Sequence, residues 1–136
     1  MTDMLIAAGP TDALTDTWVP IGALEMILLD TGVAAMVDGV QVAVFRLVDG
    51  RLFALGNHDP CSGANVLSRG ILGDVDGVAV VASPVHKQRF ELHTGRCLDA
   101  DTSVPTFQVR VRNGLIEVRL RDDRSEFGHE RGQPVS

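Results

Sequence analysis

Two short segments carry the residue types that could do chemistry in this sequence. The first, Asn57–Gly63, contains Asp59 and Cys61, and the second runs from Ser83 to His86. If the two segments meet, the Cys61 thiol, the His86 imidazole and the Asp59 carboxylate could hold one divalent ion such as zinc. The oxygen donors of Asp59 and Ser83, however, suit magnesium or calcium better than a soft metal centre. The simpler alternative is that Cys61 is a small buried apolar residue and His86 a hydrogen-bonded loop residue.

The size and composition of the chain indicate one folded domain. A sequence of 136 residues can bury roughly two-thirds of the surface of its unfolded chain. Its residues are 45% hydrophobic, but no apolar run approaches the roughly 20 residues of a membrane span. We therefore expect a soluble domain over residues 14–121. Residues 1–13 and 122–136 combine few large apolar groups with charge, Gly and Pro, which predicts a flexible tail at each end.

The charges of the sequence exclude some classes of partner. The formal net charge is −6, and the first basic residue is Arg46. Nucleic acid is not an expected partner, because binding to phosphates depends on clustered Lys and Arg. The stretch before Arg46 also lacks the positive region of a secretory signal, which predicts a cytoplasmic location. The two cysteines, Cys61 and Cys97, are too few for a disulfide framework, and a bridge between them is not expected in a reducing compartment.

The main structural signal is an Asx-Gly dipeptide between apolar stretches. It occurs at Asp38-Gly39, Asp49-Gly50, Asp76-Gly77 and Asn113-Gly114. Such dipeptides are typical of two-residue hairpin turns, so residues 33–55 are predicted to form a three-stranded meander. The two segments around Asn113-Gly114 alternate between apolar and polar residues, which predicts half-buried antiparallel strands with Arg110, Arg112 and Arg119 on the solvent face. No stretch sustains a helical period, and the fold class is all-β.

Four motifs occur together in one order along the chain: Asn57–Gly63, Leu67–Gly70, Ser83–Phe90 and Thr94–Leu98. From about Trp18 to Leu120 the sequence resembles the small subunits of assimilatory NAD(P)H-dependent nitrite reductases. The resemblance implies a Rieske-like antiparallel β-sandwich with a smaller loop-bearing subdomain.

The resemblance also identifies the two loops as degenerate positions of iron–sulfur cluster ligands. A Rieske centre needs two thiolates and two imidazoles, which that family of proteins supplies as Cys-x-His and Cys-x-x-His. The corresponding positions here hold Asp59, Cys61, Ser83 and His86. Only His86 is the expected ligand, so the prediction is that this chain binds no cluster and carries no catalytic residue.

The function implied by the resemblance is that of an accessory subunit. The large partner subunit would carry FAD, an iron–sulfur cluster and sirohaem, and would reduce nitrite to ammonia in nitrate and nitrite assimilation. Basic residues beside the loops, Arg69, Lys87 and Arg89, are the predicted docking patch for that subunit. Two alternatives remain open: a Rieske-type electron-transfer protein with unusual ligation, and a free-standing metal-binding or sensor module.

Overall fold

The structure is a computed structural model, and it describes residues 17–122, which are almost entirely strands and turns. The strands are β2 (Trp18–Ala23), β3 (Thr31–Val37), β4 (Val40–Arg46), β5 (Leu52–Gly56), β6 (Ile71–Val75), β7 (Val78–Ala82), β8 (Arg89–Glu91), β9 (Thr106–Arg112) and β10 (Leu115–Asp122). Two single-turn 3₁₀ helices, η2 (Leu24–Met26) and η3 (Leu67–Arg69), connect them. No helix within this described part of the chain is long and apolar enough to cross a membrane.

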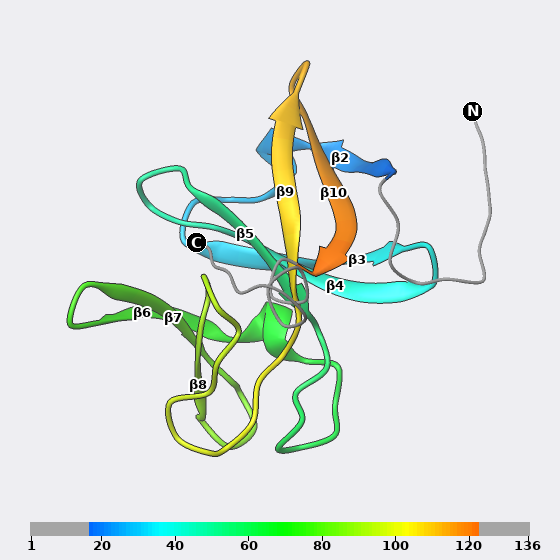
Figure 1. The fold of residues 1–136 in the computed structure, drawn as a ribbon. Coiled ribbons are helices and arrows are strands. Elements are labelled where there is room, and N and C mark those ends of the chain that lie inside the picture. The colour runs from blue at the N-terminus through cyan, green and yellow to red at the C-terminus, as the bar shows by residue number, and fades with distance from the viewer. Residues whose placement is uncertain (1–16, 123–136) are drawn as a thin grey trace, which may run out of the picture.

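The larger sheet has six antiparallel strands in the order β2-β10-β9-β5-β4-β3. It curls, so that β9 and β10 stand across the direction of β3 and β4 (Figure 1). The turns Asp38-Gly39 and Asn113-Gly114 close the β3–β4 and β9–β10 hairpins, with both residues of each turn at positive φ. This is the backbone geometry of a type I′ turn, whose twist matches that of the flanking strands.

Strand β4 is buried on both faces and divides the interior into two cores. Val42 and Val44 pack into one apolar cluster, whereas Ala43 and Phe45, on the other face, pack into a second. Successive side chains of a strand point to opposite faces, so one continuous apolar run serves both clusters. The first cluster fills the inside of the curled sheet, and the second joins that sheet to the smaller one.

The smaller sheet has three antiparallel strands in the order β6-β7-β8. It lies beside the larger sheet, below it in the view of Figure 1. Val81 and Phe90, which are paired across β7 and β8, are fully buried and pack into the second core cluster. The loop that follows β5 and the loop between β7 and β8 both leave from this region, so the smaller sheet positions the candidate site.

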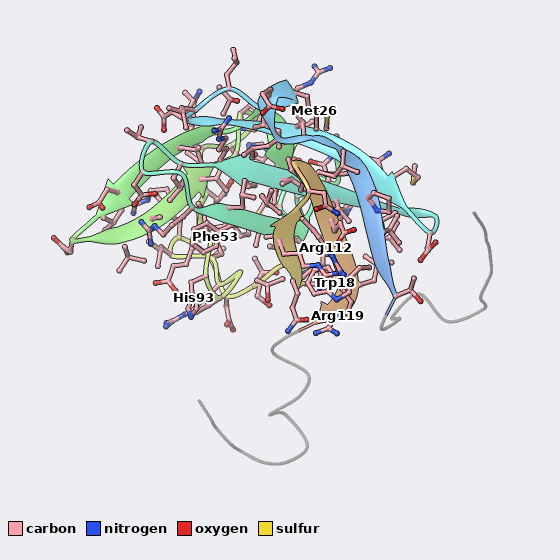
Figure 2. The ribbon with its side chains drawn as sticks, turned by 90° about the horizontal axis from the view of Figure 1, so that it is seen from above. Trp18, Met26, Phe53, His93, Arg112 and Arg119 are labelled. Atoms are coloured by element: carbon pink, nitrogen blue, oxygen red, sulfur yellow. The ribbon has the colours of Figure 1, made fainter. Side chains whose placement is uncertain are left out.

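Trp18, the one tryptophan of the sequence, packs against two arginines on the outer face of β2, β9 and β10. The guanidinium carbon of Arg110 lies 4.0 Å from the centroid of the Trp18 ring, and that of Arg119 lies 4.8 Å from it. Figure 2 shows Trp18 and Arg119 together. Cation–π contacts of this kind stabilise a sheet face modestly. Arg110 and Arg119 are therefore partly covered by packing, whereas Arg112 is exposed, as the sequence predicts for a solvated face.

The all-β fold predicted from the sequence is confirmed, including the meander of β3, β4 and β5. Ile116, Val118 and Leu120 of β10 are buried, as their alternation predicts. Helical structure in the described range is limited to the short turns η2 and η3. The predicted tails, 1–13 and 122–136, lie outside the described residues except for Asp122, which ends β10.

Candidate functional site: two loops joined by a buried carboxylate

The carboxylate of Asp59 joins the two loops whose residue types could do chemistry. Its Oδ1 accepts a hydrogen bond from the Cys61 backbone N–H at 2.9 Å. Its Oδ2 accepts one from the Ser62 hydroxyl at 2.9 Å and one from the Ser83 hydroxyl at 2.5 Å. Asp59 and Ser83 are both fully buried. The contact between the loops is therefore a hydrogen bond between two of the residues predicted as degenerate ligand positions.

The two serine hydroxyls that donate to Asp59 are themselves held in place by their own loops. The Ser62 hydroxyl accepts a hydrogen bond from the Ala64 N–H at 3.2 Å. The Ser83 hydroxyl accepts one from the Val85 N–H at 3.3 Å. Because each hydroxyl accepts locally and donates to the carboxylate, both are oriented toward Asp59.

The environment of Asp59 favours its charged form. Burial alone would raise the pKa of this carboxyl, but the hydrogen bonds from Ser83, Cys61 and Ser62 outweigh burial and lower it. Hydrogen bonds to a carboxylate stabilise the anion in this way. Asp59 is thus a buried carboxylate at neutral pH, and its negative charge is balanced by N–H and O–H dipoles.

Asn57 fixes the start of the first loop. Its side-chain amide donates to Gln41 Oε1 and to the Asn65 carbonyl, each at 3.1 Å, and its Oδ1 accepts the Ser68 N–H at 2.7 Å. The residue is 2% exposed. These bonds tie the loop to β4 and to η3. The sequence marks Asn57 only as part of a motif, because its partners lie far apart along the chain.

The second loop is a tight turn with an exposed tip. The Lys87 N–H donates to the Ser83 carbonyl at 3.0 Å, and Lys87 itself has φ of +65°. Pro84, Val85 and His86 at the tip are all exposed. The structure thus separates the roles of this loop, with Ser83 buried against Asp59 and His86 at the surface.

Cys61 lies at the edge of the site and is partly exposed. Burial raises the pKa of the Cys61 thiol, and the adjacent Cys97 and Asp59 raise it further. Cys97 is 4% exposed within the second core cluster, as expected for a packed residue. Within residues 17–122, no three His, Cys, Asp or Glu side chains are grouped as a metal site requires. The structure therefore gives the zinc hypothesis for Asp59, Cys61 and His86 no support.

The basic residues predicted as a docking patch differ in their surroundings. Arg69 at the end of η3 and Lys87 at the loop tip are exposed. Arg89 pairs with Asp99, with Nη2 2.7 Å from Oδ1 and Nε 3.0 Å from Oδ2. The hydrogen bonds from Arg89 lower the pKa of Asp99 to about 2. Asp99 offsets the charge of Arg89 locally, and the sequence does not reveal this partner because the two residues meet only across the turn after β8.

The residues in the two loops do not fit a two-iron, two-sulfide cluster. Such a cluster needs four soft or borderline donors, two thiolates and two imidazoles in the Rieske form. Two of the four positions here hold an alcohol and a carboxylate that bond to each other, and the oxygens of Asp59 are already engaged by three donors. In both fold and loop arrangement the molecule is a Rieske-type domain, one in which a hydrogen bond links the loops that a cluster would otherwise hold.

Comparison with known proteins agrees with this class. The family model of the Rieske-like [2Fe-2S] domain matches residues 17–119. The NADH nitrite reductase small subunit of Salmonella typhimurium is 42% identical over 104 residues, which cover 75% of this chain and 96% of that protein. A crystal structure from Mycobacterium tuberculosis, described as an NADH-dependent nitrite reductase small subunit, superposes with a TM-score of 0.72 at 48% identity, covering 75% of this chain and 93% of that one.

One further relative is a larger protein. The NAD(P)H nitrite reductase large subunit of Klebsiella oxytoca contains a segment 42% identical over 102 residues, which covers 74% of this chain and only 11% of that protein. The present chain belongs to the family of NADH nitrite reductase small subunits.

Proposed function

We propose that this chain is the small subunit of an NADH-dependent nitrite reductase and serves as a docking and structural component of that enzyme. The observation that carries this proposal is the Asp59–Ser83 hydrogen bond. This bond joins the two loops without a metal centre. The loop end therefore stays rigid, although most of the side chains that would hold an electron-carrying cluster are absent. The family relationship supplies the substrate class, nitrite, because no residue of this chain argues for nitrite by itself.

The large subunit is the proposed partner. In Klebsiella oxytoca a segment similar to this chain is part of a polypeptide named as a large subunit. A domain that is covalently attached to a large subunit in one organism acts there at high effective concentration. A separate chain of the same kind would need a binding surface to achieve the same proximity. We place FAD, an iron–sulfur cluster and sirohaem in that partner, as the resemblance implies, and we keep the cytoplasm as the proposed location.

The loop end is the proposed docking surface. Pro84, Val85 and His86 form an exposed tip that Lys87 follows in the chain, and Arg69 at the end of η3 is exposed as well. Val85 is 46% exposed, so the tip combines an apolar centre with basic residues at its rim. This is the common anatomy of a protein interface. The Asp59–Ser83 bond lies beneath the tip and holds it in one conformation, which reduces the entropy lost on binding.

Binding between the separate chains tests this proposal. Titration of the large subunit with this chain, followed by calorimetry, is expected to give a saturable complex. Lys87→Glu should weaken the complex about tenfold, because a reversed rim charge lowers the association rate. The matched control is Arg112→Glu, because Arg112 is the last residue of β9. That strand ends at the top of Figure 1, whereas the smaller sheet lies at the bottom.

The outcomes of that experiment separate the alternatives. A wild-type chain that does not bind the large subunit would overturn the proposed function. Equal weakening by Lys87→Glu and by Arg112→Glu would retain the partner but place the docking surface elsewhere, which would contradict the assignment of the loop end.

A further inference from the structure

The outer edge of β3 differs from the other sheet edges in the described part of the chain. β3 ends the larger sheet, and within residues 17–122 strand pairing and backbone hydrogen bonds tie it to β4 alone. An edge strand presents a row of unpaired N–H and C=O groups, to which another strand can bind. Proteins block such edges with charged residues, proline, bulges or very short strands.

The other three edge strands, β2, β6 and β8, carry features of this kind. β2 contains Pro20, and its pairing with β10 includes a register shift. β6 includes Asp74 among its five residues, and β8 has only three residues, of which Arg89 and Glu91 are charged. β3 has seven residues, contains no charge and no proline, and pairs with β4 without a register shift. Its outer edge is therefore open to a further strand.

The exposed side chains along this edge are apolar and acidic. Leu28 and Leu29, in the turn before β3, are 72% and 49% exposed, and Met36 near the end of the strand is 61% exposed. Asp30 and Asp38, which directly precede and follow the strand, are exposed as well. Residues 17–45 contain no Lys or Arg. The edge thus offers an apolar strand with a negative charge at each end.

A second copy of this chain would be a poor match for the edge. If two β3 strands paired antiparallel about a twofold axis at Ala34, Asp30 of each copy would lie opposite Asp38 of the other. Like charges that lie opposite each other in a sheet destabilise the pairing. A strand with a basic residue at each end would meet two opposite charges instead.

We propose that the outer edge of β3 binds an extended segment of another protein, one that is apolar in its middle and has Lys or Arg at both ends. The segment adds a strand to the larger sheet and forms hydrogen bonds with the free backbone groups of β3. Its basic ends pair with Asp30 and Asp38. The exposed tip of the second loop lies between β7 and β8 of the smaller sheet, so this surface is separate from the docking surface proposed above.

A synthetic peptide tests the proposal on the full chain alone. The probe is a capped peptide of alternating Val and Thr, as long as β3, with one added Lys at each end. The matched control peptide carries Glu in place of both Lys. The Lys peptide is expected to bind at least about tenfold more tightly, because its ends attract the two aspartates whereas those of the control repel them. Its affinity should fall as salt is added, and NMR hydrogen exchange should become slower at the amides of β3.

Variants of the chain test which residues carry the binding. Asn in place of both Asp30 and Asp38 removes the charges but keeps the backbone, since both residues have positive φ, which Asn tolerates. This double variant should lose the preference for the Lys peptide. Met36→Lys should weaken binding, because it adds a charge at the edge that repels the basic peptide. Ile71→Lys is the matched control, since Ile71 is 69% exposed on the edge strand β6.

Several results would overturn the proposal. The Lys peptide could fail to bind, or bind no better than the Glu peptide. The amides of β3 could all be protected in the free chain, which would mean that the edge is already covered. The chain could form a dimer that Met36→Lys dissociates, which would assign the edge to a second copy. Because the large subunit is absent from these measurements, none of these results bears on its docking at the loop end.

Discussion

Asp59 is the residue that most directly connects the sequence to the proposed function. It is fully buried, and it accepts hydrogen bonds from both loops. A buried charge is tolerated only when hydrogen bonds or a partner charge compensate for the lost water. The three donors around Asp59 meet this requirement, and because one of them comes from the other loop, the charge also joins the loops.

Removal of the Ser83 hydroxyl should destabilise the protein. Ser83→Ala leaves one acceptor site of a buried carboxylate without its donor, which costs about 1.5 to 3 kcal/mol in the free energy of unfolding. Ser62→Ala is the matched control, because Ser62 donates to the same oxygen from a partly exposed position, where water can replace it. Urea denaturation of the two variants measures the difference. A Ser83→Ala variant as stable as Ser62→Ala would contradict the structural role assigned to the link.

The stabilisation from Asp59 should depend on pH. Folding lowers the pKa of this carboxyl, so its contribution is complete above the unfolded value of about 3.9 and is lost as the pH falls through the lower folded value. Asp59→Asn removes the titration, and its stability relative to wild type isolates the effect from other carboxyls. The variant should be less stable at pH 7, and the difference should narrow below pH 4. A constant difference at all pH values would show that the charge of Asp59 does not contribute.

The residues of the site could be predicted only in part. The spacing of Asp59, Cys61, Ser83 and His86 marks both loops, and the resemblance explains why ligands are missing there. The bond between Asp59 and Ser83 could not be predicted from the sequence. Asp59 follows β5 and Ser83 follows β7, and these strands belong to different sheets, so the bond depends on how the two sheets pack. The local bond from the Cys61 N–H to Asp59 is the one that the sequence can indicate, since an aspartate side chain in a turn often accepts the backbone N–H two residues further on.

At the scale of elements, one close approach of backbone positions the segment after β8. Gly95 has φ of +78°, and a Cβ at this position would collide with the Val104 carbonyl oxygen. The same two residues are hydrogen-bonded, with the Val104 N–H donating to the Gly95 carbonyl at 2.8 Å. Only glycine allows both this backbone conformation and this approach.

Gly95→Ala should therefore destabilise the fold more than an alanine at another positive-φ glycine. Gly77 is the matched control, because it has φ of +88° in the β6–β7 turn and a Cβ there would enter open space, with nothing within 4 Å. We expect a loss of about 1 kcal/mol in the free energy of unfolding for Gly77→Ala from backbone strain, and about 3 kcal/mol for Gly95→Ala, which adds a steric clash. Thermal denaturation of both variants measures the two losses in stability. Equal losses would show that the backbone around Val104 can shift at little cost to accommodate the added Cβ.

The elements themselves were predictable where local chemistry determines them. Asx-Gly turns and alternating strands predict the hairpins β3–β4 and β9–β10 correctly. The continuous apolar run of β4 is typical of a strand buried on both faces, but such a short run does not by itself distinguish a strand from a buried helical segment. Strand β8 has only three residues, too few for a period to be recognised. Its position depends on pairing with β7 rather than on its own sequence.

At the scale of the whole molecule, the protein is a Rieske-type domain that has kept its architecture while its loops are joined by other means. The two cores share β4, so the smaller sheet and its loops are anchored to the curled sheet. A rigid loop end is useful both to an electron carrier and to a docking subunit. The two functions differ in the side chains at the four ligand positions of the loops. Here two of those side chains, Asp59 and Ser83, are hydrogen-bonded to each other.

An iron and acid-labile sulfide assay on protein purified without oxygen tests most directly whether the loops are joined without a cluster. We predict a colourless, folded protein with iron far below the roughly two atoms per chain of a Rieske cluster, and the same result for the chain isolated from its complex with the large subunit. Near-stoichiometric iron and sulfide with a Rieske-like visible spectrum would contradict this prediction, because Asp59 and Ser83 would then have to release each other to accommodate a cluster.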